Sequence, residues 1–212
     1  MTVNNIVNMS ALNSLEIIAL TDHNSSRNCP AFLEVAKRVG IKALAGMEIN
    51  TAEEVHAVCL FPTLERAMAF DELVYACLPD INNRPNIFGE QLILNALDEV
   101  TGQLDKLLIN ASGISFYDLS RLMDDYGGLY FPAHIDRDSF SLLSNLGFVP
   151  PDCIMSAVEI KDMNKYPDIL SNNPIIKNLP IMHNSDAHYL WDIAEATNHL
   201  DEKIYNIIAG WL

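Results

Sequence analysis

The chain has 212 residues, of which 50% are hydrophobic, and this length and composition suit one domain with a sizeable core. Its formal net charge of -15 repels nucleic acid, so we do not expect general nucleic-acid binding. The four cysteines form no C-x-x-C pair, residues 1–10 lack a signal peptide, and no apolar run approaches the roughly 18 residues of a membrane span. We therefore expect a reduced, cytoplasmic protein that does not enter a membrane.

Apolar periodicity and turn residues predict alternating helices and strands through the first half of the chain. These are a helix over 2–13, a strand over 16–21, a helix over 30–39, strands over 41–45 and 55–61, and a helix over 63–77. Pro30 suits the first turn of its helix, and Gly40 suits the position after its end. Residues 79–90 are rich in Pro, Gly and Asn, so we expect a loop or a short excursion there.

The alternation continues in the second half, whereas residues 92–97 and 106–109 carry no clear pattern. The predicted elements are a helix over 115–126, a strand over 129–132, a short helix over 139–146, strands over 157–160 and 181–184, and a helix over 201–212. Such a pattern predicts a parallel sheet with crossover helices, either open and doubly wound or closed as a barrel. Without a repeat or a linker, residues 1–212 form a single predicted domain.

Side chains that can bind metal lie in or just beyond the predicted strands. In α/β folds the ligand site lies at the carboxyl ends of the strands, so these side chains can converge on one centre. Imidazole and carboxylate groups are ligands for divalent transition metals. The candidates are Asp22, His23, Glu48, His56, His134, Asp186 and His188.

Each candidate also has an ordinary interpretation. Asp22 could cap a turn, and a lone Glu such as Glu48 is usually solvated. His56 lies inside an apolar strand, where a histidine is more often a core residue than a ligand. His183 and His199 lack a comparable setting and are expected to be ordinary surface or core residues.

Arg137 follows the predicted strand that ends near His134. Its planar fork of donors could hold a phosphate group. It could equally form a plain salt bridge with Asp136 or Asp138. The pair Asp186-Ala187-His188 is a better metal signal, because it presents an oxygen ligand and an imidazole within one turn.

Four separate motifs, in this order, resemble those of the PHP family, the polymerase and histidinol phosphatase domains. They read IIALTDHN over 17–24, GMEIN over 46–50 leading to EVH over 54–56, PAHIDR over 132–137, and SDAH over 185–188. The resemblance extends from about residue 2 to about residue 200. It implies a distorted, TIM-like (β/α)7 barrel and the hydrolysis of phosphate esters.

The resemblance also implies a cluster of up to three divalent ions, for which Mn²⁺, Zn²⁺ and Fe²⁺ are about equally suited. The positions that match metal ligands of the family are His23, Glu48, His56, His134, Asp186 and His188. Asp22 matches a carboxylate beside the cluster, where it could orient a histidine. A phosphate contact by Arg137 is our own hypothesis.

The resemblance fails at the start of the chain. Family members open with a strand that ends in H-x-H, and this sequence has no histidine before His23. We therefore expect a barrel that lacks its first strand. Either the chain is a truncated, non-catalytic protein with a binding or regulatory role, or its native form carries an additional segment before Met1.

The function favoured by the sequence is a metal-dependent phosphoesterase. It would hydrolyse a small phosphate ester or a nucleotide, with a metal-activated water as the nucleophile. The expected partner is a small phosphorylated substrate, and the sequence is compatible with an oligomer.

Overall fold

A four-stranded sheet in the order β1-β2-β3-β6 forms the centre of the computed structural model, which describes residues 1–212. Its strands are β1 (Ile17–Leu20), β2 (Lys42–Asn50), β3 (His56–Phe61) and β6 (Leu129–Pro132). A parallel pair, β7 (Val158–Glu159) and β8 (Ile181–Met182), lies beside β6. The Ser156 N–H donates to the Tyr130 carbonyl at 3.0 Å and links the two sheets.

The strand directions correct the predicted parallel sheet. The pairs β1–β2 and β7–β8 are parallel, whereas β2–β3 and β3–β6 are antiparallel. Only residues 51–55 connect β2 to β3, and a connection of that length cannot contain a crossover helix. The architecture is therefore mixed α/β.

The predicted (β/α)7 barrel is not confirmed, because the strands do not close into a ring. No ladder joins β8 to β1, and β7 and β8 are only two residues long. Such short strands supply too few hydrogen bonds to carry a continuous sheet around a barrel.

Helices cover one face of the main sheet. They are α1 (Val3–Leu12), α2 (Cys29–Val39), α3 (Leu64–Cys77) and α5 (Leu119–Tyr126). Their buried side chains, such as Phe32 and Phe70, pack in one core with Met47 and Ile49 of β2. This face carries most of the apolar area that the fold removes from water.

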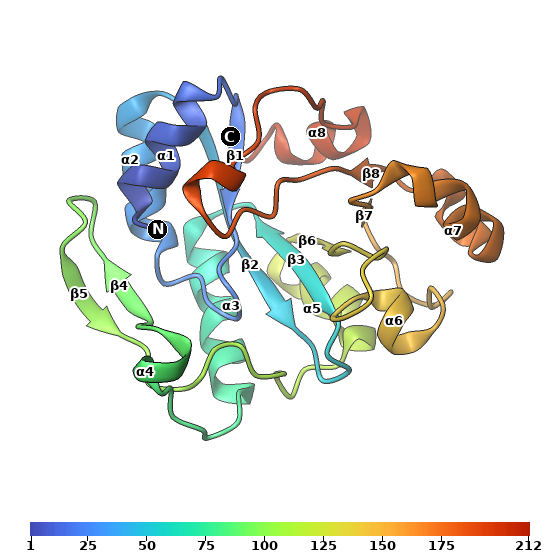
Figure 1. Cartoon of the computed structure of the whole chain (residues 1–212), viewed down its shortest axis with the longest axis horizontal. Helices are drawn as coiled ribbons and strands as arrows, with labels where there is room; N and C mark the ends of the chain where they lie inside the picture. Colours follow the sequence, from blue (N-terminus) through green and yellow to red (C-terminus); the bar gives the residue numbers. More distant parts are fainter.

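The other face of the sheet packs against the end of the chain. Helix α8 (Glu202–Ile208) inserts Ile204 and Ile208 into a second core with Leu44, Val58 and Phe131. Figure 1 shows α8 on the opposite side of β1 from α1 and α2. We call this face, which packs against α8, the inner face of the sheet. One end of it is filled by apolar side chains.

Local capping explains most helix boundaries. The predicted helices over 2–13, 30–39 and 63–77 are confirmed within about two residues. Gly40 ends α2 in the left-handed conformation with φ of 87°, which glycine adopts without strain. Ser115 caps a 3-10 turn that precedes α5, and Ser141 caps α6 (Leu142–Leu146).

Residues 79–110 form an excursion beside the main sheet, coloured green in Figure 1. It contains α4 (Pro85–Phe88) and the hairpin of β4 (Leu92–Leu94) and β5 (Val100–Gln103). The Asn24 amide donates to the carbonyls of Leu108 and Asn110 and ties the excursion to the loop after β1. The remaining helix, α7 (Tyr166–Asn172), lies between β7 and β8 in the chain. None of the helices has the length and apolar character needed to cross a membrane.

Gly46 in β2 provides a test of this packing. A Cβ at Gly46 would lie 2.7 Å from Leu60 Cδ2 and 2.8 Å from the Cys59 carbonyl oxygen, which the β2–β3 ladder holds in place. We expect Gly46→Ala to lower the free energy of unfolding by about 1–3 kcal/mol, the usual cost of overpacking. Urea denaturation measures the change.

The matched control is Gly102→Ala in β5, where the nearest atom, Ile93 Cδ1, would be 3.6 Å from the new Cβ. This variant should unfold close to the wild type. Equal urea midpoints for Gly46→Ala and the wild type would contradict the close packing of β2 against β3 at Gly46.

Candidate metal centre

The centre forms where the carboxyl ends of β1, β2 and β6 meet the amino end of β3. A parallel bridge pairs His23 with Glu48, and the Asn24 N–H donates to the Glu48 carbonyl at 2.9 Å. Because successive side chains alternate between the two faces of a strand, Glu48 shares the inner face with Leu44 of the second core. The carboxylate of Glu48 therefore points into the interior.

The antiparallel direction of β3 places its first residue at the same edge. His56 pairs with Asn50 at the end of β2, and its carbonyl accepts from the Ala133 N–H at 3.0 Å. His134 lies two residues beyond the end of β6. His56, expected inside a strand and more often a core residue there, reaches the centre because β3 runs antiparallel to β2.

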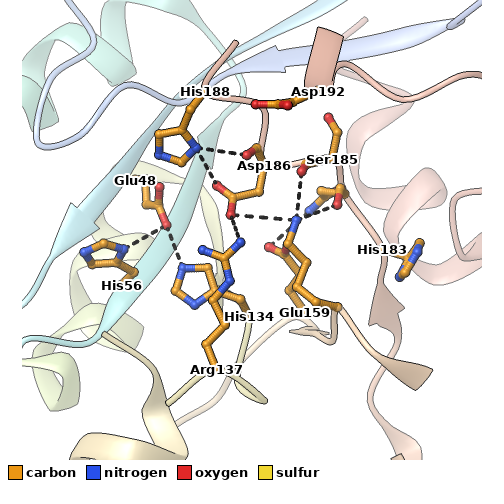
Figure 2. Close-up of polar contacts among 12 residues, drawn as sticks. Glu48, His56, His134, Arg137, Glu159, His183, Ser185, Asp186, His188 and Asp192 are labelled. Atoms are coloured by element: carbon orange, nitrogen blue, oxygen red, sulfur yellow. Dashed lines mark hydrogen bonds and ion pairs between the residues drawn. The ribbon is translucent and has the colours of Figure 1, made fainter. Parts of the chain in front are cut away.

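Three imidazoles surround the Glu48 carboxylate. His56 Nδ1 lies 3.2 Å and His134 Nε2 lies 3.5 Å from Oε1, while His23 Nδ1 lies 3.6 Å from Oε2. Figure 2 shows His56 and His134 directed at the same carboxylate. The donor atoms of His23, Glu48 and His56 all lie within 4.8 Å of one another, which suits ligation of a single ion.

The environment keeps Glu48 charged although its side chain is only 7% exposed. Burial raises its pKa, but the neighbouring imidazoles of His134, His56 and His23 outweigh burial and hold the pKa well below its ordinary value. Yet Oε1 has no hydrogen-bond partner. A buried, charged carboxylate with imidazoles near both oxygens, and with Oε1 lacking a hydrogen-bond partner, fits a divalent cation.

His23 is biased toward the neutral form, in which an imidazole binds metal. Burial lowers its pKa, and the nearby His56 and His188 act in the same direction. The carboxylates of Glu48 and Asp186 oppose this shift without reversing it.

A second group of charges faces the Glu48 cluster. Arg137 Nη2 lies 3.0 Å from Asp186 Oδ2, and Lys161 Nζ lies 3.7 Å from the same oxygen. Lys161 Nζ also lies 3.4 Å from Oε1 of Glu159, which is 2% exposed. Burial raises the pKa of Glu159. His188 is mostly exposed, with Nδ1 4.0 Å from Asp186 Oδ1.

Three residues of this region have left-handed backbone conformations that are uncommon for side chains with a Cβ. Their φ angles are 32° for His134, 52° for Phe140 and 51° for Asp186. Such strain collects at functional sites. The Phe140 ring stacks on His56 with centroids 4.9 Å apart, and its carbonyl accepts from the His56 N–H.

The structure brings seven of the eight predicted site residues into one hollow of about 70 Å³. Its lining residues are His23, Glu48, His56, His134, Arg137, Ser139, Phe140, Asp186 and His188. Arg137 pairs with Asp186, so the predicted salt bridge with Asp136 or Asp138 does not form.

Asp22 is the site residue that the structure places elsewhere. It directly precedes His23, and the alternation of side chains directs it away from the inner face. Its carboxylate accepts from the Asn28 amide at 3.3 Å, and burial raises its pKa. Asp22 makes no contact with an imidazole, so it does not orient a ligand in the way that we expected.

The sequence did not identify four residues of the site, Glu159, Lys161, Phe140 and Ser139. A signal for Glu159 was present, because a carboxylate interrupts the apolar strand predicted over 157–160. Lys161 and Phe140 carried none, since a lysine or a phenylalanine in a loop predicts no particular site.

Comparison with known proteins identifies the family of the chain and its fold. The family model of the PHP domain matches residues 1–130. The chain belongs to the PHP domain family. A search of curated proteins finds no match.

Solved structures share the fold over nearly the whole chain. A protein of Bifidobacterium adolescentis assigned as a metal-dependent phosphoesterase has a TM-score of 0.65 at 15% identity, with 99% of this chain and 91% of that chain covered. An amidohydrolase of Chromobacterium violaceum has a TM-score of 0.61 at 16% identity, covering 99% and 92%.

The lesion-specific endonuclease Q of Pyrococcus furiosus gives a TM-score of 0.61 at 18% identity. The match covers 99% of this PHP-family chain but 51% of the endonuclease. At these identities the likeness establishes the fold alone.

The lowered pKa of His23 predicts a pH dependence for the metal-free protein. The unfolded chain takes up a proton near the ordinary value of 6.5, whereas folded His23 resists protonation until the pH is lower. The contribution of His23 to the free energy of unfolding is therefore fully present above pH 6.5. It is lost as the pH falls from 6.5 toward the lower pKa of folded His23. Denaturant unfolding in the presence of a chelator, about one pH unit above and below 6.5, measures the slope.

We expect His23→Gln to flatten this slope. His199→Gln, which removes an exposed imidazole outside the hollow, should leave it unchanged. Identical slopes for the wild type and His23→Gln would contradict the burial of His23 in a neutral form.

Proposed function

We propose that this protein is a metal-dependent phosphoesterase whose metal is held at Glu48. Membership of the PHP family, and a fold shared with a protein assigned as a metal-dependent phosphoesterase, support this proposal. The observation that carries the proposal is the buried, charged Glu48 carboxylate, which lacks a hydrogen-bond partner and is surrounded by His23, His56 and His134.

His23, Glu48 and His56 would hold the ion, with His134 beside the Glu48 carboxylate. A bound divalent ion would activate water and polarise a phosphoryl oxygen, which is the chemistry that ester hydrolysis requires. Glu48 supplies the negative charge, and the imidazoles supply the remaining ligands. Imidazole with carboxylate suits Mn²⁺, Fe²⁺ or Zn²⁺.

Arg137 is suited to bind the phosphoryl group. Its side chain is 47% exposed at the edge of the hollow, and Asp186 fixes one end of the guanidinium. The remaining N–H donors stay available for phosphoryl oxygens, which the planar fork of arginine binds in bidentate geometry. Phosphate and metal would then lie on facing walls of one hollow.

The size of the hollow favours a small substrate. About 70 Å³ holds a phosphoryl group and little more, so the rest of the substrate must project outward. A small phosphate ester or a nucleotide meets this requirement. The net charge of -15 disfavours long nucleic acid. The endonuclease Q of the comparison, which is solved with an abasic duplex, is about twice as long as the matched segment.

The first test compares Glu48→Gln with the wild type. The substitution keeps the shape of the side chain but removes its charge, so it should reduce bound Mn²⁺. It should also lower kcat/KM on p-nitrophenyl phosphate roughly 100-fold or more, the scale of losing one electrostatic contact at reacting atoms. Metal analysis and steady-state kinetics provide the two measurements.

The control is Glu72→Gln, an exposed substitution on α3 that should change neither quantity. If Glu48→Gln kept the wild-type metal content and rate, the proposal would fail. Metal binding by the wild type without turnover of any ester would support the alternative, a non-catalytic binding or regulatory protein.

The second test concerns Arg137. Arg137→Lys keeps the charge but loses the bidentate fork, so KM for the ester and the inhibition constant of inorganic phosphate should both rise roughly 10-fold. Bound metal should stay the same. The control is Arg121→Lys on the exposed side of α5, which should match the wild type. Unchanged phosphate inhibition in Arg137→Lys would exclude this role.

A further inference from the structure

Lys161 lies where several oxygen atoms of the site converge. Its Nζ donates to the Asn184 and Ser185 carbonyls at 2.9 Å each. Glu159 Oε1 and Asp186 Oδ2 lie 3.4 and 3.7 Å from the same nitrogen. Figure 2 shows Glu159, Ser185 and Asp186 arranged around this point. Two carboxylates and two carbonyls thus surround one ammonium group.

The ammonium is held among oxygens of the protein. A lysine ammonium has three N–H groups, of which two donate to the carbonyls, and the two carboxylates lie within ion-pair distance of the nitrogen. The side chain is 20% exposed, against 47% for Arg137. Lys161 is therefore less available to a substrate oxygen than Arg137 is.

The carboxylates in turn need a cation. Glu159 is 2% exposed, and its Oε1 has no hydrogen-bond partner. Asp186 Oδ2 is also buried without a hydrogen bond, and its only close charges are Arg137 and Lys161. Buried carboxylates are stable when a positive charge is placed among them. Here a side chain of the protein supplies that charge.

We propose that the Lys161 ammonium takes the place of a divalent ion beside Asp186 and Glu159, so that the chain holds metal at the Glu48 cluster alone. This inference rests on the proposed function, because it limits the number of ions in the same site. It departs from the cluster of up to three ions that the family resemblance implies.

The physical reason is competition for the same oxygens. An ion at Asp186 must displace an ammonium from two carbonyls and two carboxylates, and the displaced charge would remain beside it. Two like charges in a poorly solvated hollow repel strongly. The Glu48 cluster carries no such competitor, since Glu48 forms no ion pair with a lysine or an arginine and its close neighbours are imidazoles.

Metal content provides the test, with Mn²⁺ as the probe. Wild-type protein is saturated, freed of loose ions and analysed for manganese per chain, and titration calorimetry gives the number of sites. We expect about one Mn²⁺ for the wild type. Lys161→Met, which removes the ammonium but keeps a chain of similar length, should bind about two.

Two further variants control for charge and position. Lys161→Arg retains a cation and should stay at one ion. Lys165→Met removes a neighbouring lysine that donates to the Asp136 carbonyl outside the hollow, and it should also stay at one ion. If Lys161→Met does not fold, Asp186→Asn answers the same question, because its manganese content should equal that of the wild type.

Two or more ions in the wild type, one ion in folded Lys161→Met, or loss of the ion in Asp186→Asn would each overturn the inference. The first two results leave the metal site at Glu48 intact, and the third would make Asp186 a ligand of that ion. A wild type that binds no Mn²⁺ would instead overturn the proposed function itself, so the two failures are distinguishable.

Discussion

The structure of the site depends on one buried negative charge, the carboxylate of Glu48. A carboxylate removed from water is stable only when positive or hydrogen-bonding groups replace its hydration shell. The fold supplies three imidazoles from three different segments, and it places them near the carboxylate without hydrogen-bonding Oε1. Strand β2 must therefore continue past Gly46, where the sequence suggests that it stops, so that Glu48 is held rigidly in the ladder with β3.

The alternation of side chains along β2 and β3 builds the core and the site at the same time. Met47 and Ile49 face the helices, while Leu44 and Glu48 face the interior. A shift of one residue in register would exchange these faces and bury the site under the helices. The close approach at Gly46 holds this register, because only a residue without Cβ fits beside the Cys59 carbonyl.

The motifs were sufficient to predict which residues gather, because metal-binding side chains at strand ends have few other reasons to recur. They could not predict how the strands run. Whether β3 is parallel or antiparallel to β2 depends on the five residues of their connection, and the apolar pattern of β3 reads the same in both directions. Asp22 was misplaced because adjacent residues of a strand face opposite sides. The contact between Lys161 and Asp186 joins loops 25 residues apart, and such a pairing leaves no periodic pattern in the sequence.

The position of α8 has a consequence for substrate binding and product release. Ile204 and Ile208 pack with Leu44 on the inner face of the sheet, so apolar side chains fill the part of that face away from the metal-binding residues. The polar hollow is therefore small, about 70 Å³. In a phosphoesterase built this way, phosphate and ester would compete for the same space, and free phosphate around the protein would set how often the hollow accepts a new ester.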